Sequence, residues 1–195
     1  MFKLLADKLT KLLIKDNIIK DDEYDIYKYG FEMLVYFIFN ISMALLVGVI
    51  FNRVIQTIIF LCCYSTIRQF TGGYHARNYT ECTLTFIVMY IVINLIDINL
   101  DIDRYKYILL IMPILSTFVI YKISPLEHRN KPLNESEKVK YRSIAIELSL
   151  IASLVSILSL IFDILFNYMV YIIFALICIS ILLIIGKQTN KKALI

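Results

Sequence analysis

Long apolar runs separated by short polar stretches dominate this chain. A helix needs about 20 mainly apolar residues to span a bilayer, with a range of about 17–25. The second run is the weakest, because its apolar part, Val54 to Ile67, is short enough for a re-entrant segment. In the fifth run, Glu147 and several serines predict a face turned toward other helices. We predict six transmembrane helices, at residues 31–51, 54–70, 83–100, 105–123, 143–163 and 166–186.

The first residues follow a different pattern, in which apolar side chains recur at helical spacing with lysines between them. These apolar residues are Phe2, Leu5, Leu9 and Leu12 or Leu13. The pattern predicts an amphipathic helix over residues 2–16 that lies on the membrane surface, although an ordinary packing helix would look similar. The expected fold is therefore an all-α integral membrane protein. It would have six transmembrane helices and an N-terminal amphipathic interfacial helix, in a single domain over residues 1–195.

Composition agrees with a membrane class. The chain is 59% hydrophobic and 18% charged, whereas soluble domains are about 45–50% apolar and about 25% charged. A soluble domain of 195 residues has no means of burying so much apolar surface. Three of the four cysteines lie within apolar runs, there are only two histidines, and there is no CxxC pair. We therefore expect no disulfide framework, metal site or cofactor, and no nucleic-acid partner.

The basic residues predict how the chain crosses the membrane, because cytoplasmic loops are enriched in lysine and arginine. If the N-terminus is inside and all six segments cross, 17 of the 20 basic residues face the cytoplasm. Only Arg53, Arg104 and Lys106 fall outside. We predict a multi-pass protein of the cell membrane with both termini and residues 68–82 in the cytoplasm. A re-entrant second segment would move the later loops to opposite sides and lose this separation.

One polar stretch, RQFTGGYHARNYTEC at residues 68–82, interrupts the apolar pattern. His75 and Cys82 are seven residues apart, which on one straight helix is about 10.5 Å of rise. That is too far for a hydrogen bond of about 2.6–3.2 Å. The glycine pair Gly72-Gly73 removes the difficulty, because glycine permits the backbone angles that end a helix and turn the chain. His75 can then fold back above the next helix.

That next helix should begin near Asn78 or Thr80, because Asn78 and Glu81 together resemble a capping box. Cys82 then lies in the first turn, where the helix dipole favours an anion. A cysteine at a helix N-terminus beside a histidine is typical of nucleophilic catalysis.

Simpler interpretations of these residues remain open on spacing alone. His75 would be a solvated loop residue and Cys82 a packing residue. Arg68 either binds a carboxylate or anchors its helix at the lipid headgroups. Glu81 either orients His75 or only caps a helix.

The same stretch resembles the signature of the accessory gene regulator B (AgrB) family, which are membrane cysteine endopeptidases of Gram-positive quorum sensing. That signature has an arginine, a glycine two residues before a His-Ala pair, and a cysteine seven residues after the histidine. Its positions are occupied here by Arg68, Gly73, His75, Ala76 and Cys82. The chain length, the amphipathic start, the six apolar segments and a basic loop with Lys131-Pro132 also match.

The resemblance implies an endopeptidase that removes the C-terminal tail of an AgrD-like precursor peptide through an acyl-enzyme thioester. A side chain of the peptide would then close a thiolactone or lactone ring. Cys82 would be the nucleophile and His75 the general base and acid. Arg68, Gly73 and Glu81 would support the site or bind substrate. The implied partners are the precursor peptide, the bilayer and a second copy in a homodimer. A small transporter or exporter and a non-enzymatic membrane scaffold remain the alternatives.

Overall fold

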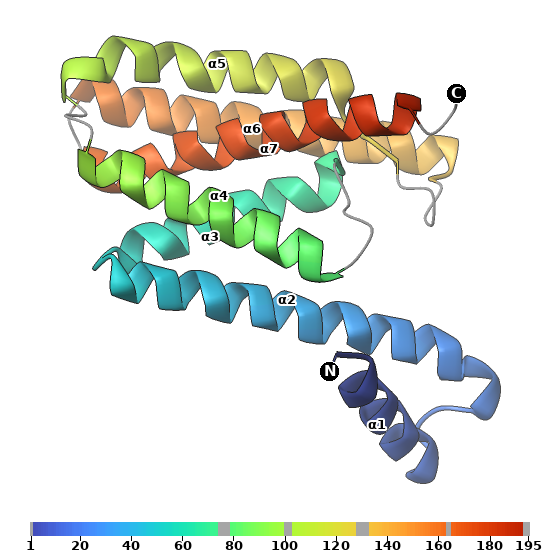
Figure 1. The fold of residues 1–195 in the computed structure, drawn as a ribbon. Helices are drawn as coiled ribbons and strands as arrows, with labels where there is room; N and C mark the ends of the chain where they lie inside the picture. The colour runs from blue at the N-terminus through green and yellow to red at the C-terminus, as the bar shows by residue number, and fades with distance from the viewer. Residues whose placement is uncertain (1, 74–78, 100–102, 128–132, 163–164, 193–195) are drawn as a thin grey trace. The chain divides into compact units, whose positions relative to one another are not determined.

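The computed structural model describes residues 2–73, 79–99, 103–127, 133–162 and 165–192. Within these ranges the chain forms α-helices and no strand, joined by short connections (Figure 1). Two single-turn 3-10 helices, Asp21–Glu23 and Asp103–Tyr105, precede α2 and α5. The α-helices are α1 (Phe2–Lys15), α2 (Tyr24–Ile50), α3 (Val54–Thr71), α4 (Tyr79–Asn99), α5 (Lys106–Ile123), α6 (Glu135–Phe162) and α7 (Phe166–Lys192). The predicted all-α membrane class is confirmed.

Five of the described helices, α2, α4, α5, α6 and α7, are long and apolar enough to cross a membrane. The other long helix, α3, has 18 residues without a break. It is about 27 Å long, against a hydrocarbon core of about 30 Å. α3 also contains the buried polar residues Gln56 and Thr57. A re-entrant segment turns back within the membrane, and α3 has no such internal turn. We therefore keep the prediction that α3 crosses the membrane.

Two helices begin earlier than the apolar pattern predicts. α2 starts at Tyr24 rather than residue 31, and α6 starts at Glu135 rather than residue 143. Both have acidic residues in their first turn, where the helix dipole favours negative charge. Hydrophobicity therefore marks the part of each helix suited to lipid, while the helices themselves extend further toward water.

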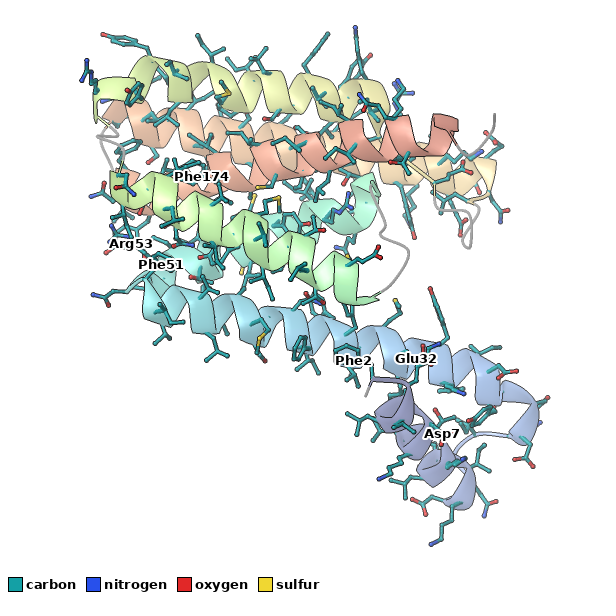
Figure 2. The ribbon with its side chains drawn as sticks, in the orientation of Figure 1. Phe2, Asp7, Glu32, Phe51, Arg53 and Phe174 are labelled. Atoms are coloured by element: carbon teal, nitrogen blue, oxygen red, sulfur yellow. The ribbon has the colours of Figure 1, made fainter. Side chains whose placement is uncertain are left out.

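The chain divides into two compact units, Met1–Leu46 and Val47–Ile195. In the first unit, α1 contacts α2 at two places (Figure 2). The ring of Phe2 packs edge-on against Phe39, with centroids 5.2 Å apart. Asp7 accepts hydrogen bonds from Lys11 and Tyr24, and these two partners hold the pKa of its carboxyl below the ordinary value. Leu4, Leu5 and Leu12 of α1 remain exposed, which suits a helix at a membrane surface.

The second unit is a bundle of α3 to α7, and α7 contacts α3, α5 and α6. Its core contains Ile67, Ile120, Ala145, Leu176, Ile179 and Leu183. Four serines of α6 lie at buried positions, as predicted, where small residues let helices approach closely: Ser149, Ser153, Ser156 and Ser159. The prediction for Glu147 was wrong, because this residue is exposed and accepts a hydrogen bond from Ser143 at 2.8 Å. Glu147 lies two positions from buried Ser149, which places it on the opposite face of the helix.

The helix ends of the second unit gather at two opposite ends (Figure 1). At one, which we call the Gly72 end, the chain after α5 meets the end of α3. The N–H of Leu126 donates to the Thr71 carbonyl at 2.9 Å, and Gly72 and Leu126 form an isolated parallel bridge. Arg142 near the start of α6 reaches the Tyr121 carbonyl of α5 at 3.4 Å.

The opposite end, which we call the Asp97 end, is held by a charged group. Arg53, just before α3, lies here (Figure 2) and its Nε contacts Asp97 Oδ2 of α4 at 2.8 Å. The Tyr171 hydroxyl of α7 donates to the same carboxylate oxygen at 3.1 Å. The α3 and α4 helices therefore run antiparallel, with α7 packed beside them.

We predict that the Gly72 end faces the cytoplasm, because most described basic side chains of this unit lie toward it. A single cysteine introduced at Asn134 should resist a membrane-impermeant maleimide applied to intact cells. One introduced at Arg104 should react. Both should react after the cells are permeabilised. Labelling of position 134 but not 104 in intact cells would overturn this orientation.

Candidate active site

The polar stretch at residues 68–82 runs from the end of α3 to the start of α4, so the contacts between these two helices define its surroundings. The two helices are antiparallel, so each step forward on α3 is matched by an equal step back on α4. Three contacts define this register: Arg53 with Asp97 at 2.8 Å, Phe60 with Tyr90 at 4.9 Å between ring centroids, and Tyr64 with Phe86 at 5.4 Å.

Extended by one turn, this register pairs Arg68 with Cys82. Residues four apart share one face of a helix. Arg68 follows Tyr64 by four residues, and Cys82 precedes Phe86 by four. Both residues therefore lie toward the Gly72 end, Arg68 in the last turn of α3 and Cys82 in the first turn of α4.

Cys82 occupies the first turn of α4, as the sequence predicts, because α4 begins at Tyr79. Its side chain is half-buried, whereas Glu81 beside it is exposed. His75 and Asn78 lie outside the described residues. The cap at Asn78, the pairing of His75 with Cys82 and the role of Glu81 therefore stay predictions.

The turn after α3 depends on glycine. Gly72 has φ +65° and Gly73 has φ +131°, values that glycine adopts without strain and other residues rarely adopt. The N–H of Gly72 donates to the Arg68 carbonyl at 3.2 Å and so caps the helix. A Cβ on Gly72 would lie 2.1 Å from the Leu126 carbonyl oxygen. The bridge between α3 and the segment after α5 therefore requires glycine at this position.

Arg68 turns its guanidinium back over this turn. Its Nη1 donates to the Gly72 carbonyl, and a Cβ on Gly73 would lie 1.8 Å from the same nitrogen. The guanidinium thus rests against the backbone of Gly73. This contact gives a physical reason for an arginine and a glycine five residues apart in the sequence stretch: the glycine leaves the space that the arginine fills.

Replacing Gly73 with alanine should therefore displace the Arg68 side chain. The positive φ adds strain of about 1–3 kcal/mol. We expect peptide processing to fall at least about tenfold, as measured by the rate of precursor cleavage. Gly30→Ala is the matched control, because nothing lies within 4 Å of a Cβ at that position. Equal rates for the two variants would mean that the contact between Arg68 and Gly73 is unimportant.

Two ion pairs and one cation–π contact also lie at the Gly72 end. The Lys138 ammonium lies 2.7 Å from a carboxylate oxygen of Glu127 and 2.7 Å from one of Glu135. Arg142 lies over the ring of Tyr121 at 5.5 Å from its centroid. Among the residues that the structure describes, no group of three or more His, Cys, Asp or Glu side chains is arranged to hold a metal ion.

Tyr64, one turn before Arg68, was not singled out by sequence reasoning. Its ring stacks on Phe60 of α3 and contacts Phe86 of α4. In an apolar helix its spacing from Phe60 is that of ordinary core packing.

Comparison with known proteins agrees with the resemblance. The family model described as accessory gene regulator B matches residues 6–185. AgrB-like protein 2 of Clostridium perfringens strain 13 is 27% identical over 143 residues, which is 71% of this chain and 65% of that protein. The AgrB-like protein of strain SM101 is 26% identical over 165 residues, 82% of this chain and 75% of that protein. The Listeria monocytogenes EGD-e relative is 26% identical over 89 residues, 45% and 44% of the two chains.

These three relatives carry their AgrB-like names provisionally, and the chain spans less than two thirds of the first and third. No solved structure matches it. The family model, however, covers nearly the whole chain, with apolar helices throughout that range. This membrane protein therefore belongs to the accessory gene regulator B (AgrB) family, which connects it with agr quorum sensing.

Proposed function

We propose that this protein is a membrane cysteine endopeptidase that removes the C-terminal tail of an AgrD-like precursor and allows the remaining peptide to close into a ring. The observation that carries the proposal is the place of Cys82 in the first turn of α4, in a chain that matches the AgrB model over residues 6–185.

The first half of the reaction is acyl transfer to Cys82. His75 takes the proton of the Cys82 thiol, and the sulfur attacks the scissile carbonyl and forms a carbon–sulfur bond. Negative charge moves to the carbonyl oxygen. When the tetrahedral intermediate collapses, the carbon–nitrogen bond breaks and His75 gives a proton to the leaving amine. The tail departs with a new N-terminus, and the rest of the peptide remains bound as a thioester.

The second half closes the ring. A cysteine thiol or serine hydroxyl within the peptide attacks the thioester carbonyl, its proton passes to His75, and the Cys82 sulfur leaves. The product is a thiolactone or lactone, and the enzyme is regenerated without an outside reactant. A thioester survives long enough for this step where water is scarce. The half-buried position of Cys82, at the end of a helix bundle suited to a bilayer, supports such an environment.

Arg68 would stabilise the charge that develops in both halves. A fixed guanidinium is attracted first to the thiolate and then to the oxyanion on the attacked carbonyl. Its contacts with Gly72 and Gly73 hold it against the turn of the chain, which favours a role in the site over a headgroup anchor.

The charge of the Gly72 end supports recruitment of a peptide with an acidic tail, since complementary charge raises the rate of encounter. Lys122, Lys140 and Arg142 lie toward that end and are exposed. We further propose that this end faces the cytoplasm, that the exposed leucines of α1 rest on the bilayer where an amphipathic leader would also bind, and that the protein acts as a homodimer.

The test is co-expression with the peptide of a neighbouring short reading frame that encodes an amphipathic leader, one cysteine or serine, and an acidic tail. Mass analysis should detect the released tail and an N-terminal product lighter by one water than its linear acid. Export of an uncut precursor would indicate a transporter. An unchanged precursor, with the protein present in the membrane, would favour a scaffold.

A further inference from the structure

We propose that the last turn of α5 and Arg142 of α6 form a binding site for the phosphate group of an anionic phospholipid. The site lies on the exposed face of α5, whose other face packs against α6 and α7 (Figure 1). It combines two cations, each seated on an aromatic ring, with an apolar strip suited to acyl chains. The inference goes beyond the endopeptidase proposal and does not depend on it.

One face of α5 is apolar and exposed along most of the helix. Its side chains recur every three or four residues and are each about half exposed: Ile108, Ile111, Ile114, Leu115 and Phe118. The opposite face is buried against α6 and α7. An exposed apolar face on a helix long enough to span a membrane suits hydrocarbon. The strip ends at Phe118 and α5 ends at Ile123, so the last turn lies where hydrocarbon gives way to headgroups.

Two aromatic rings at this end of α5 each carry a cation. Phe118 and Tyr121 are three residues apart, so their rings are neighbours on the exposed face. The Lys122 ammonium lies over the Phe118 ring, 4.6 Å from its centroid. The Arg142 guanidinium lies over the Tyr121 ring, 5.5 Å from its centroid. Because the rings are adjacent, the two positive groups from two helices are brought to the same turn of α5.

Both cations keep hydrogen-bond donors for a ligand. A guanidinium has five N–H groups, and within the described residues Arg142 forms one hydrogen bond, 3.4 Å long, to the Tyr121 carbonyl. In the same parts of the chain neither Lys122 nor Arg142 forms a salt bridge with a carboxylate. A guanidinium fork matches the oxygens of a phosphate, and an ammonium binds them as a compact charge. The pair is therefore suited to a phosphodiester.

The direction of the Lys122 side chain favours a lipid headgroup as its partner. A lysine that only snorkels extends away from the hydrocarbon toward water. Lys122 instead turns back over Phe118, which lies one turn earlier and belongs to the apolar strip. Its ammonium is thereby held at the boundary where lipid phosphates lie, and basic groups between transmembrane helices bind anionic headgroups at this depth. An acidic peptide arriving from water would meet the same charges but would make no use of the strip.

The experiment measures which lipid occupies the strip. The chain contains no tryptophan, so Leu115→Trp places a single fluorophore there. The full-length protein is reconstituted in phosphatidylcholine vesicles that contain either brominated phosphatidylcholine or brominated phosphatidylglycerol, because bromine quenches tryptophan on contact. The ratio of quenching gives the relative affinity of the two lipids. Phosphatidylglycerol should bind at least about tenfold more tightly, since each basic residue near an anionic lipid contributes about fivefold.

Charge variants identify the residues that hold the anionic lipid. Lys122→Gln and Arg142→Gln should each lower the preference for phosphatidylglycerol about fivefold, and the double variant should abolish it. Lys140→Gln is the matched control, because it removes an exposed cation from the same end of α6 that lies over neither aromatic ring. Its preference should stay within about twofold of the parent, since salt screens an exposed charge that makes no contact.

Equal affinities for the two lipids in the parent protein would overturn the inference. So would an equal loss of preference in Lys140→Gln and in the two site variants, because diffuse charge would then explain the attraction. If neither brominated lipid quenches the tryptophan, a second copy of the chain covers the strip in place of lipid. If a short oligoglutamate restores the fluorescence quenched by phosphatidylglycerol, the cations belong to a peptide site, and lipid is again excluded. None of these measurements uses the precursor peptide, so their outcome is independent of cleavage.

Discussion

Replacing Cys82 with serine should abolish precursor cleavage while leaving the protein folded in the membrane. The change keeps almost the same shape and substitutes a far less acidic hydroxyl for the thiol, so the nucleophile is lost but the packing of α4 is retained. We expect a loss of about a thousandfold or more, measured as the rate of tail release. Cys82→Ala and His75→Ala should each cause a loss of the same order, and their combination little more, because members of a catalytic pair act as a unit.

The other three cysteines provide the control for this prediction. Cys62 and Cys63 lie in the middle of α3 and Cys178 in α7, whereas Cys82 lies in the first turn of α4. The triple change of these three to alanine should keep most of the activity. If the triple variant is inactive while Cys82→Ala still cuts the peptide, the nucleophile has been assigned to the wrong residue.

Much of the fold was predictable, because lipid imposes a simple rule on sequence. A backbone in hydrocarbon must satisfy its own hydrogen bonds, so long apolar runs become helices. Each of the six predicted segments coincides largely with one α-helix, and the predicted amphipathic start is α1. The helix starts at Tyr24 and Glu135 were missed because hydropathy is insensitive to the polar turns that extend beyond the lipid. Glu147 was misplaced because one charged residue does not reveal which face of a helix is buried.

The site was predictable only in part, for a different reason. The resemblance to the AgrB signature grouped Arg68, Gly73 and Cys82, and the glycine pair Gly72-Gly73 predicted a turn. The contact of Arg68 with the backbone at Gly73 depends on rotamers, and the position of Cys82 relative to Arg68 depends on how α3 and α4 pair. Register follows from contacts such as Phe60 with Tyr90, which no local pattern encodes.

That register depends on a polar network at the far end of the bundle. Asp97 is buried and accepts hydrogen bonds from Arg53 at 2.8 Å and Tyr171 at 3.1 Å, which join α4 to the start of α3 and to α7. One turn earlier, buried Asn94 lies 3.2 Å from the same tyrosine hydroxyl. Asp97 is fifteen residues from Cys82, about 22 Å along α4. The network can therefore fix how the helices pair without touching the chemistry.

Asp97→Ala should consequently destabilise the protein without a direct effect on catalysis. Removing one partner of a buried ion pair costs about 3–5 kcal/mol. Arg53 remains 37% exposed here, and water will solvate part of its charge, so we expect about 2–3 kcal/mol. For a chain of this size the melting temperature should fall by about 5–10 °C, measured on purified protein in detergent. Arg104→Ala, which removes an exposed charge near the same end, should change it little.

The Arg53→Ala/Asp97→Ala double variant distinguishes a lost pair from general damage. If the two side chains stabilise the bundle through each other, the double variant should be clearly more stable than the sum of the single losses predicts, because no unpaired charge is left behind. At temperatures where Asp97→Ala is fully folded, its cleavage rate should stay within about threefold of the parent, since the register is then intact. A large loss of activity in folded Asp97→Ala protein, with its melting temperature unchanged, would mean that this end of the bundle takes part in the reaction itself.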